Sequence, residues 1–226
     1  VVAENTSAAY HEEDNSIRTD NIPRYYQMRL KTKDALTQYV TFEKLIQDPV
    51  GNLTVIYEEM KSDYEKCVYE FNHTRFQTVN AKERFRDALE NYQHEIGRFR
   101  KGIDQIEYRD FVKKAFVLYE QTFMTKLAGE HRQISGWRLF QIVFIVSLIC
   151  EMIRSEYKND PNIAEADIET ANLLYFPTGG GKTEAFLGAC VFNMFFDRLR
   201  GKNDGITAFL KYPLRCLQCN SLIVCL

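Results

Sequence analysis

The sequence predicts an α/β protein in which a helical N-terminal region precedes part of a parallel-sheet domain with a phosphate-binding loop. Three glycines and a Lys-Thr pair, at 179–183, lie between an apolar stretch, 171–176, and a long apolar run, 184–199. This order of strand, loop and helix is the setting in which proteins hold the phosphates of a nucleotide. Upstream, residues 25–135 are charged, rich in Tyr and Phe and nearly free of Pro, which indicates a region of helices.

The N-terminal part divides into a tail and this helical region. Residues 1–24 are polar and rich in Glu, Asp and Asn, so we expect a disordered tail. A turn is expected at 48–51, because Asp, Pro and Gly occur together there. Apolar residues around it recur at spacings of three and four, as amphipathic helices require. Helices are expected over 31–47, 52–71, 79–108 and 109–127.

Residues 136–226 are expected to form the second domain. The apolar segment 142–153 predicts a buried helix that is too short to cross a bilayer. The run 184–199 is apolar nearly all round, which predicts a second buried helix. A buried strand is expected over 206–210, after a turn. With a first strand over 171–176, these elements predict one right-handed βαβ unit of a parallel sheet.

The candidate phosphate-binding residues form one run: Pro177, Thr178, Gly179, Gly180, Gly181, Lys182 and Thr183. The glycines lack Cβ, so their backbone can approach a ligand closely and turn its N–H groups toward an anion. Lys182 supplies a positive charge for the outer phosphates. The Thr183 hydroxyl is expected to ligate Mg²⁺ bound to the phosphate oxygens. The alternative is a glycine-rich turn followed by a Lys-Thr pair that has no role in binding.

The loop departs from the strict G-x-x-x-x-G-K-[ST] pattern, because Phe176 occupies its first position. It resembles motif I of the superfamily 2 helicases and translocases. The resemblance implies a partial RecA-like domain over 136–226, with ATP and Mg²⁺ as cofactors. Arg138 and Gln141 resemble an R-x-x-Q signature of that superfamily, whose Gln binds the adenine edge as both donor and acceptor. The alternative for Gln141 is a polar residue at the start of a buried helix.

A second motif follows the last predicted strand. The segment 212–215 resembles motif Ia of the same superfamily, which makes Arg215 the candidate nucleic-acid contact. The alternative is a loop arginine that faces solvent. Together with 98–103, 137–141 and 172–185, these residues resemble a bacterial helicase-like family associated with phage defence, which includes the DISARM helicases. The resemblance implies ATP-driven movement of the complete protein on nucleic acid, expected to be DNA.

The resemblance is incomplete, because such motors also need a D-E-x-H-type acidic motif and a second RecA-like lobe with an arginine finger. The sequence contains no Asp or Glu after Asp204. We therefore expect an N-terminal or truncated fragment, from a truncated or frame-shifted gene, that binds ATP without hydrolysing it. It has no candidate catalytic residue, and the missing lobe is its expected partner. The alternatives are a helical interaction module with a phosphate-binding loop and no enzymatic role, and a P-loop kinase or GTPase.

Charge and cysteines constrain the partners and the compartment. The net charge is −2, so no overall field attracts nucleic acid. Basic residues in 84–101 are interleaved with Asp87, Glu90 and Glu95, which favours an ordinary solvated face over a nucleic-acid surface. The six cysteines are scattered and no signal peptide is evident, which indicates reduced thiols in the cytoplasm and no membrane contact. Cys216 and Cys219 have metal-ligand spacing but no second pair, so no zinc site is expected.

Overall fold

We analysed a computed structural model of the chain. The residues that it describes are 8–11, 16–19, 33–76, 78–129, 134–164, 171–175, 180–211 and 223–225. The chain divides into two compact units, Val1–Lys33 and Asp34–Leu226, which we describe separately. In the first unit, strands β1 (Ala8–His11) and β2 (Ser16–Thr19) pair antiparallel, with Ala8 opposite Thr19. The rest of the tail expected over 1–24 lies outside the described residues.

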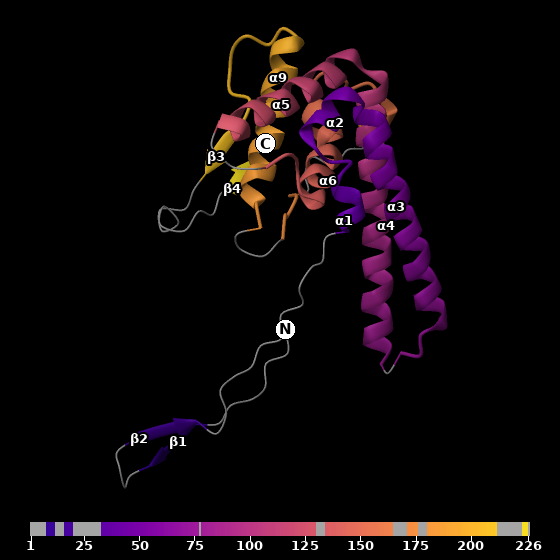
Figure 1. Ribbon diagram of the computed structural model, residues 1–226. Helices are drawn as coiled ribbons and strands as arrows, with labels where there is room; N and C mark the ends of the chain where they lie inside the picture. The colour runs from indigo at the N-terminus through magenta and orange to yellow at the C-terminus, as the bar shows by residue number, and fades with distance from the viewer. Residues whose placement is uncertain are drawn as a thin grey trace. The chain divides into compact units, whose positions relative to one another are not determined.

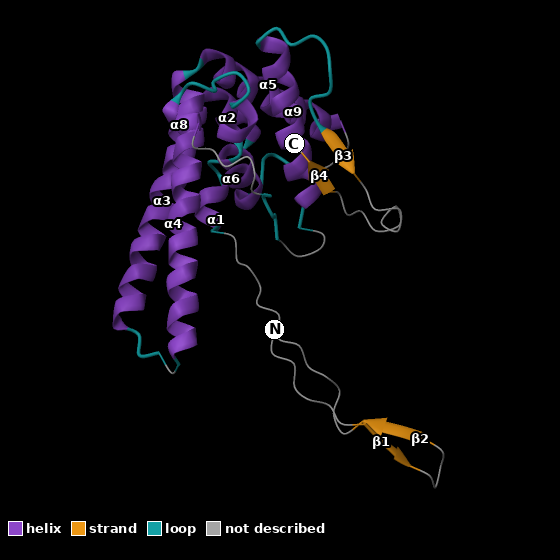
Figure 2. Cartoon of the chain, turned by 180° about the vertical axis from the view of Figure 1, so that it is seen from behind, coloured by secondary structure: helices purple, strands orange, loops and turns teal. Residues whose placement is uncertain are grey.

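In the residues that the structure describes, the second unit consists of α-helices followed by one pair of short strands (Figures 1 and 2). Its helices are α1 (Asp34–Thr37), α2 (Phe42–Gln47), α3 (Pro49–His73), α4 (Val79–Tyr108), α5 (Asp110–Gly129), α6 (Leu139–Ser147), α7 (Ile149–Ile153), α8 (Pro161–Ala164) and α9 (Lys182–Leu199). Its strands are β3 (Phe209–Lys211) and β4 (Ile223–Cys225), which pair antiparallel.

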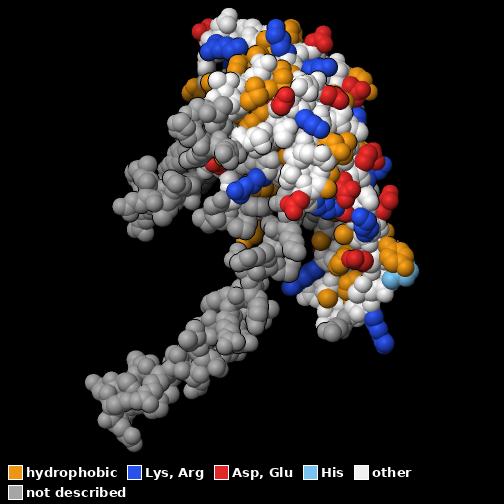
Figure 3. Space-filling model, in the orientation of Figure 1, with side chains coloured by type: hydrophobic (Ala, Val, Ile, Leu, Met, Phe, Trp, Pro, Cys, Tyr) orange, Lys and Arg blue, Asp and Glu red, His pale blue; other side chains and the backbone are white. Residues whose placement is uncertain are grey.

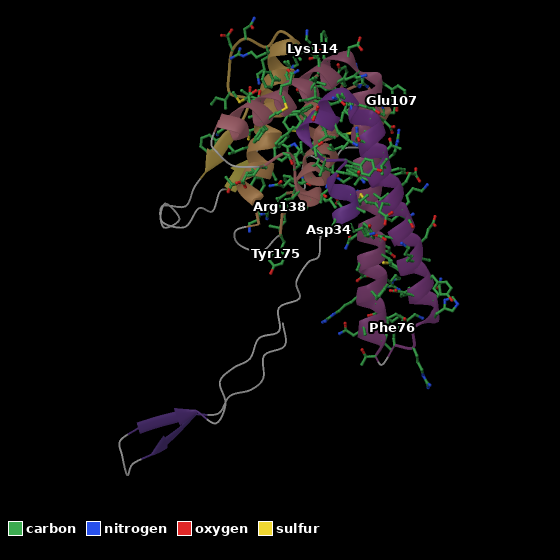
Figure 4. All side chains as sticks on the ribbon, viewed as in Figure 1. Asp34, Phe76, Glu107, Lys114, Arg138 and Tyr175 are labelled. Carbon is green, nitrogen blue, oxygen red and sulfur yellow. The ribbon has the colours of Figure 1, made fainter. Side chains whose placement is uncertain are left out.

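The two longest helices, α3 and α4, run side by side as an antiparallel arm (Figures 1 and 2). Each begins at a capping side chain. The Asp48 carboxylate accepts from the Gly51 N–H at 2.9 Å, and the Thr78 hydroxyl accepts from the Ala81 N–H at 3.1 Å. Aromatic rings join the arm at its distal end, which Phe76 marks in Figure 4. The other end of α4 enters the core, where its buried residues recur at helical spacing: Ile96, Phe99, Ile103 and Ile106.

One hydrophobic core joins α4, α5, α6 and α9. Tyr119 of α5 packs edge-on against Phe192 of α9, with the ring centroids 6.3 Å apart. Close helix packing depends on small residues: Gly188 of α9 lies beside Ile145 of α6, where an added Cβ would approach the Ile145 Cδ1 to 2.6 Å. This packing brings the first turns of α6 and α9 together, and the candidate site forms there.

The prediction of a parallel-sheet domain is wrong, because the strand pairs in the described residues are both antiparallel and the core is helical. Residues 171–175, expected as the first strand, have no regular secondary structure. The expected strand 206–210 is replaced by β3, whose partner is β4 rather than a strand before α9. Parallel pairing requires two strands distant in sequence to meet, whereas β3 and β4 need only a short connection.

Several helix boundaries also differ from the predictions. The expected helix 31–47 divides into α1 and α2, because Thr41 caps α2 and pairs with Gly136 as an isolated antiparallel bridge. Residues 48–51, expected as a turn, instead begin α3, with Asp48 as its cap and Pro49 in its first turn. The expected helix 142–153 is divided at Leu148 into α6 and α7.

Candidate functional site

The N-terminus of α9 lies at the centre of the candidate site. Gly181 precedes the helix at φ 87° and ψ 28°, a left-handed conformation that only glycine adopts at little cost. Within the described part of the chain, no side chain forms a capping hydrogen bond at this end of α9. Lys182 and Thr183 are half-buried in its first turn, and Gly180 is buried. The first N–H groups of a helix have no acceptor within it and, with the helix dipole, favour a bound anion.

Two side chains from the start of α6 bind the backbone of this loop. Arg138 Nη1 donates to the carbonyl oxygen of Gly180 at 2.7 Å. Gln141 Nε2 donates to the carbonyl oxygen of Gly181 at 2.7 Å. Gln141 Oε1 accepts from the backbone N–H of Arg138 at 2.8 Å, so both ends of this amide are engaged. Arg138 and Gln141 therefore form a unit, the loop latch, which holds two consecutive carbonyl groups of the predicted phosphate-binding loop.

The segment that carries the loop latch is fixed by contacts to α2 and α5. The Trp137 N–H donates to the carbonyl of Val40 at 2.9 Å. Its indole Nε1 donates to both carboxylate oxygens of Glu120, at 3.0 and 2.9 Å. The Trp137 ring packs against Phe42 of α2 and Phe123 of α5. Arg138 thus follows a residue that is anchored on three sides.

Glu120 is fully buried in α5, which is unusual for a carboxyl group. Burial raises its pKa from the usual 4.5 to about 8, because removal from water disfavours the charged form. The hydrogen bond from Trp137 favours the carboxylate but does not offset burial. The buried acid is therefore largely protonated at neutral pH, directly behind the segment that holds the loop.

The segment that leads into the loop is tied to α4. Arg98 donates to the Asn172 side chain at 2.8 Å, and the same guanidinium pairs with Glu151 at 2.8 Å and Glu95 at 3.1 Å. Leu173 and Tyr175 project outward, 87% and 89% exposed. Figure 4 shows Arg138 and Tyr175 at the same edge of the helical body.

The C-terminal end of α9 is anchored separately, at Asp197. Its carboxylate accepts from Lys202 and Thr207, each at 2.7 Å, and from Arg200 at 2.9 Å. Burial alone would raise the pKa of Asp197, but these three hydrogen bonds hold it below its usual value. Lys202, a basic residue near the candidate loop in the sequence, is thus an internal partner of this carboxylate.

Paired charges also account for the basic stretch of α4. Arg86 lies near Glu90 at 3.9 Å, and Arg100 pairs with Asp104 and with Glu107, the latter at 3.4 Å. Figure 3 shows Lys and Arg side chains interspersed with Asp and Glu over the described face. These contacts support the solvated-face interpretation for Arg86 and Arg100, whereas Arg98 is 19% exposed and binds Glu151 and Asn172.

The structure brings together five of the predicted site residues: Gly180, Gly181, Lys182, Thr183 and Gln141. The other predicted site residues, Pro177, Thr178, Gly179 and Arg215, lie outside the described residues. Cys216 and Cys219 do as well, while Cys67, Cys150 and Cys190 are free. Sequence reasoning missed Glu120 and assigned Arg138 only to a signature. Glu120 lies four residues after Phe116 and three before Phe123, so helical spacing places it on the apolar face of α5, and this spacing was the available signal.

The residues at the start of α9 fit the phosphates of a nucleotide with Mg²⁺. The absence of a Cβ at Gly181 lets the backbone lie close to Gln141, since a Cβ there would lie 2.6 Å from Gln141 Nε2. Thr183 offers one hydroxyl ligand for Mg²⁺, with the rest left to phosphate and water. In the part of the chain that the structure describes, no group of three His, Cys, Asp or Glu residues could hold a metal. Among these same residues, no helix is both long enough and apolar enough to cross a membrane.

The comparisons with known proteins agree with part of the sequence resemblance. No family model matches the chain. The chain is similar to DISARM protein DrmA of Bacillus paralicheniformis, with 31% identity over 164 aligned residues. The alignment covers 62% of this chain and 14% of that relative, so the chain corresponds to about one seventh of the relative's length. The similarity therefore links this chain to one portion of a DISARM protein.

Proposed function

We propose that this chain is the ATP-binding portion of a helicase-related phage-defence protein. The observation that carries the proposal is the left-handed Gly181, which directly precedes Lys182 and Thr183 at the start of α9. The similarity to a DISARM protein supports the biological setting. Helicase activity, movement on DNA and contact through Arg215 belong in this proposal to the complete protein.

The α9 N-terminus binds the phosphates through its backbone and two side chains. N–H groups of the first turn donate to phosphate oxygens, and the helix dipole favours their negative charge. The Lys182 ammonium neutralises the outer phosphates. The Thr183 hydroxyl contributes one ligand to Mg²⁺, which supplies further neutralisation of the phosphate chain when bound.

The chain by itself binds ATP without hydrolysing it. Hydrolysis in such motors needs carboxylates that orient Mg²⁺ and the attacking water. Glu184 is the acidic residue in the first turn of α9, and the sequence has no Asp or Glu after Asp204. In this proposal the acidic motif belongs to the complete protein, as does the second lobe with its arginine finger, which is the expected partner.

Binding of a fluorescent ATP analogue with Mg²⁺ tests the proposal. Lys182→Ala is expected to weaken binding at least tenfold, because a charge-assisted contact contributes about 1.5–3 kcal/mol. Lys158→Ala is the matched control, since Lys158 is exposed in the turn after α7. Equal binding by the wild type and Lys182→Ala would refute a phosphate role for this residue.

A second assay separates binding from turnover. Purified chain is incubated with ATP and Mg²⁺, with and without single-stranded DNA, and released phosphate is measured. No release above background is expected in either condition. Robust turnover that Lys182→Ala abolishes would contradict the statement that the chain alone does not hydrolyse ATP.

The helical core of the described residues favours one alternative, a helical interaction module without enzymatic role. In that case the α3–α4 arm carries the function and the loop has no ligand. The binding assay distinguishes the two functions. An ATP-binding portion gives a Mg²⁺-dependent signal that Lys182→Ala removes, whereas an interaction module gives no such signal.

A further inference from the structure

The amide of Gln141 is committed on both sides in this structure. Its Nε2 donates to the Gly181 carbonyl at 2.7 Å, and its Oε1 accepts from the Arg138 N–H at 2.8 Å. Recognition of an adenine edge needs one donor and one acceptor from the same amide. A Gln amide has two N–H donors and two acceptor lone pairs, so Gln141 keeps one of each, but its two hydrogen bonds fix the orientation of the amide toward the loop and the first turn of α6. The structure gives this side chain a different task.

The loop latch sets the direction of two peptide groups. Arg138 holds the carbonyl of Gly180, and Gln141 holds the carbonyl of Gly181. In a trans peptide the C=O and the following N–H point in opposite directions. The N–H groups of Gly181 and Lys182 are therefore turned away from α6. Consecutive N–H groups that share a direction form an anion-binding concavity.

The loop latch has a rigid support. Gly136 lies so close to the residues before α2 that an added Cβ would approach the Val40 carbonyl oxygen to 2.4 Å. Trp137 is buried, and its indole is hydrogen-bonded to Glu120. Arg138 follows directly, and its backbone N–H donates to Gln141 Oε1 at 2.8 Å. The loop is thus held against the α2–α5 part of the core and does not depend on α9 alone.

We propose that Arg138 and Gln141 are positioning residues that preorganise the phosphate loop and do not read the base. The site of the described residues then recognises the polyphosphate chain with Mg²⁺, whatever base is attached. This inference rests on the proposed phosphate binding, and it departs from the expectation that Gln141 binds adenine. A preorganised loop lowers the entropic cost of ordering the loop on binding. Loss of this preorganisation therefore lowers the affinity for every ligand that carries the same phosphate chain.

Three ligands with a common phosphate chain test the inference on the full 226-residue chain. ATP, GTP and inorganic tripolyphosphate are titrated calorimetrically with Mg²⁺ into the wild type, Arg138→Gln and Gln141→Leu. Each of the two substitutions is expected to lower the affinity for all three ligands by the same factor, about tenfold. This is the loss expected when one hydrogen bond between charged or preorganised groups is removed. Arg138→Lys keeps one donor and is expected to lose less. Exposed Arg84→Gln and Gln47→Leu are the matched controls.

One outcome of this titration overturns the inference. If Gln141→Leu weakens ATP but leaves GTP and tripolyphosphate unchanged, Gln141 reads adenine. A loss that is equal for the three ligands supports the positioning role, because a base reader has no effect on tripolyphosphate.

Hydrogen exchange without ligand tests the loop latch independently of binding. The Ala185 N–H donates to the Gly181 carbonyl at 3.4 Å, so it reports the order of the first turn of α9. Faster exchange at Ala185 is expected in Arg138→Gln and Gln141→Leu, with no change at Phe192 in the middle of the helix. If the wild type binds none of the three ligands, the proposed function is wrong. Hydrogen exchange then tests by itself whether the loop latch orders the start of α9. Unchanged exchange in both variants overturns the loop latch, whatever the ligands do.

Discussion

Two features of Gly181 require glycine: its positive φ and its close contact with the Gln141 side chain. At φ 87° an alanine costs roughly 1–2 kcal/mol, and its Cβ would lie 2.6 Å from Gln141 Nε2. Gly181→Ala is therefore expected to break the Gln141 contact and to weaken binding of a fluorescent ATP analogue about tenfold or more. Gly201→Ala, at the other end of α9, is the control: it has the same φ of 87° and no atom within 4 Å of its Cβ. An equal loss of binding in both variants would contradict a specific role for Gly181.

Glu120 predicts how stability depends on pH. Because burial raises its pKa from 4.5 to about 8, the folded chain holds the proton more tightly than the unfolded chain between these values. The stabilisation is complete below about pH 4.5 and is lost as pH rises to about 8, at roughly 1.4 kcal/mol per unit mid-range. Urea unfolding from pH 5 to 9 should show this fall, and Glu120→Gln should remove it.

Trp137 provides the control for this pH dependence. It is the one Trp in the sequence, and its indole donates to the Glu120 carboxyl, so its fluorescence should titrate near pH 8 in the wild type. Glu120→Gln keeps an acceptor for the indole but cannot ionise. A fluorescence titration that persists in this variant would mean that another group is responsible.

At the scale of elements, the crossing of α4 and α6 depends on Gly102. An added Cβ at this position would lie 2.0 Å from the Val146 carbonyl oxygen, which is backbone and cannot rotate away. Gly102→Ala is therefore expected to lower the free energy of unfolding by about 2–3 kcal/mol, because the two helices must separate. Thermal unfolding followed by circular dichroism measures the change.

Gly97, five residues earlier on α4, provides the opposite expectation. It is exposed, and nothing lies within 4 Å of an added Cβ. Gly97→Ala should stabilise the chain by about 0.5–1 kcal/mol through reduced backbone freedom in the unfolded state. If both alanine variants shift the melting temperature in the same direction, the α4–α6 contact is not the cause.

Elements differ in how far the sequence predicts them, for a physical reason. The long helices were predictable, because the spacing of Phe99, Ile103 and Ile106 is a local pattern that packing only reinforces. The parallel sheet was not, because strand pairing depends on partners distant in sequence, and β3 pairs with β4 instead. The same holds at the site. The glycines and Lys182 follow a motif, whereas the contact of Arg138 with Gly180 spans 42 residues and requires the fold.

At the scale of the whole molecule, apolar side chains outside the core are expected to control association. Leu173, Tyr175 and Ile206 are 87%, 89% and 76% exposed, although the sequence predicted buried strands around them. The free energy of removing such surface from water is about 25 cal/mol per Å², which favours contact between copies of the chain.

We therefore expect the isolated chain to self-associate as its concentration rises. Light scattering after size-exclusion chromatography should give an apparent mass above the monomer's 26.5 kDa. Replacing Leu173 and Tyr175 by Ser should shift the mass toward the monomer, because neither side chain contributes to the core. Val79→Ser is the control, since Val79 is 76% exposed at the start of α4 in the arm. A wild-type chain that stays monomeric at every concentration would contradict the prediction, and equal effects of the two replacements would show that the location of the apolar surface is unimportant.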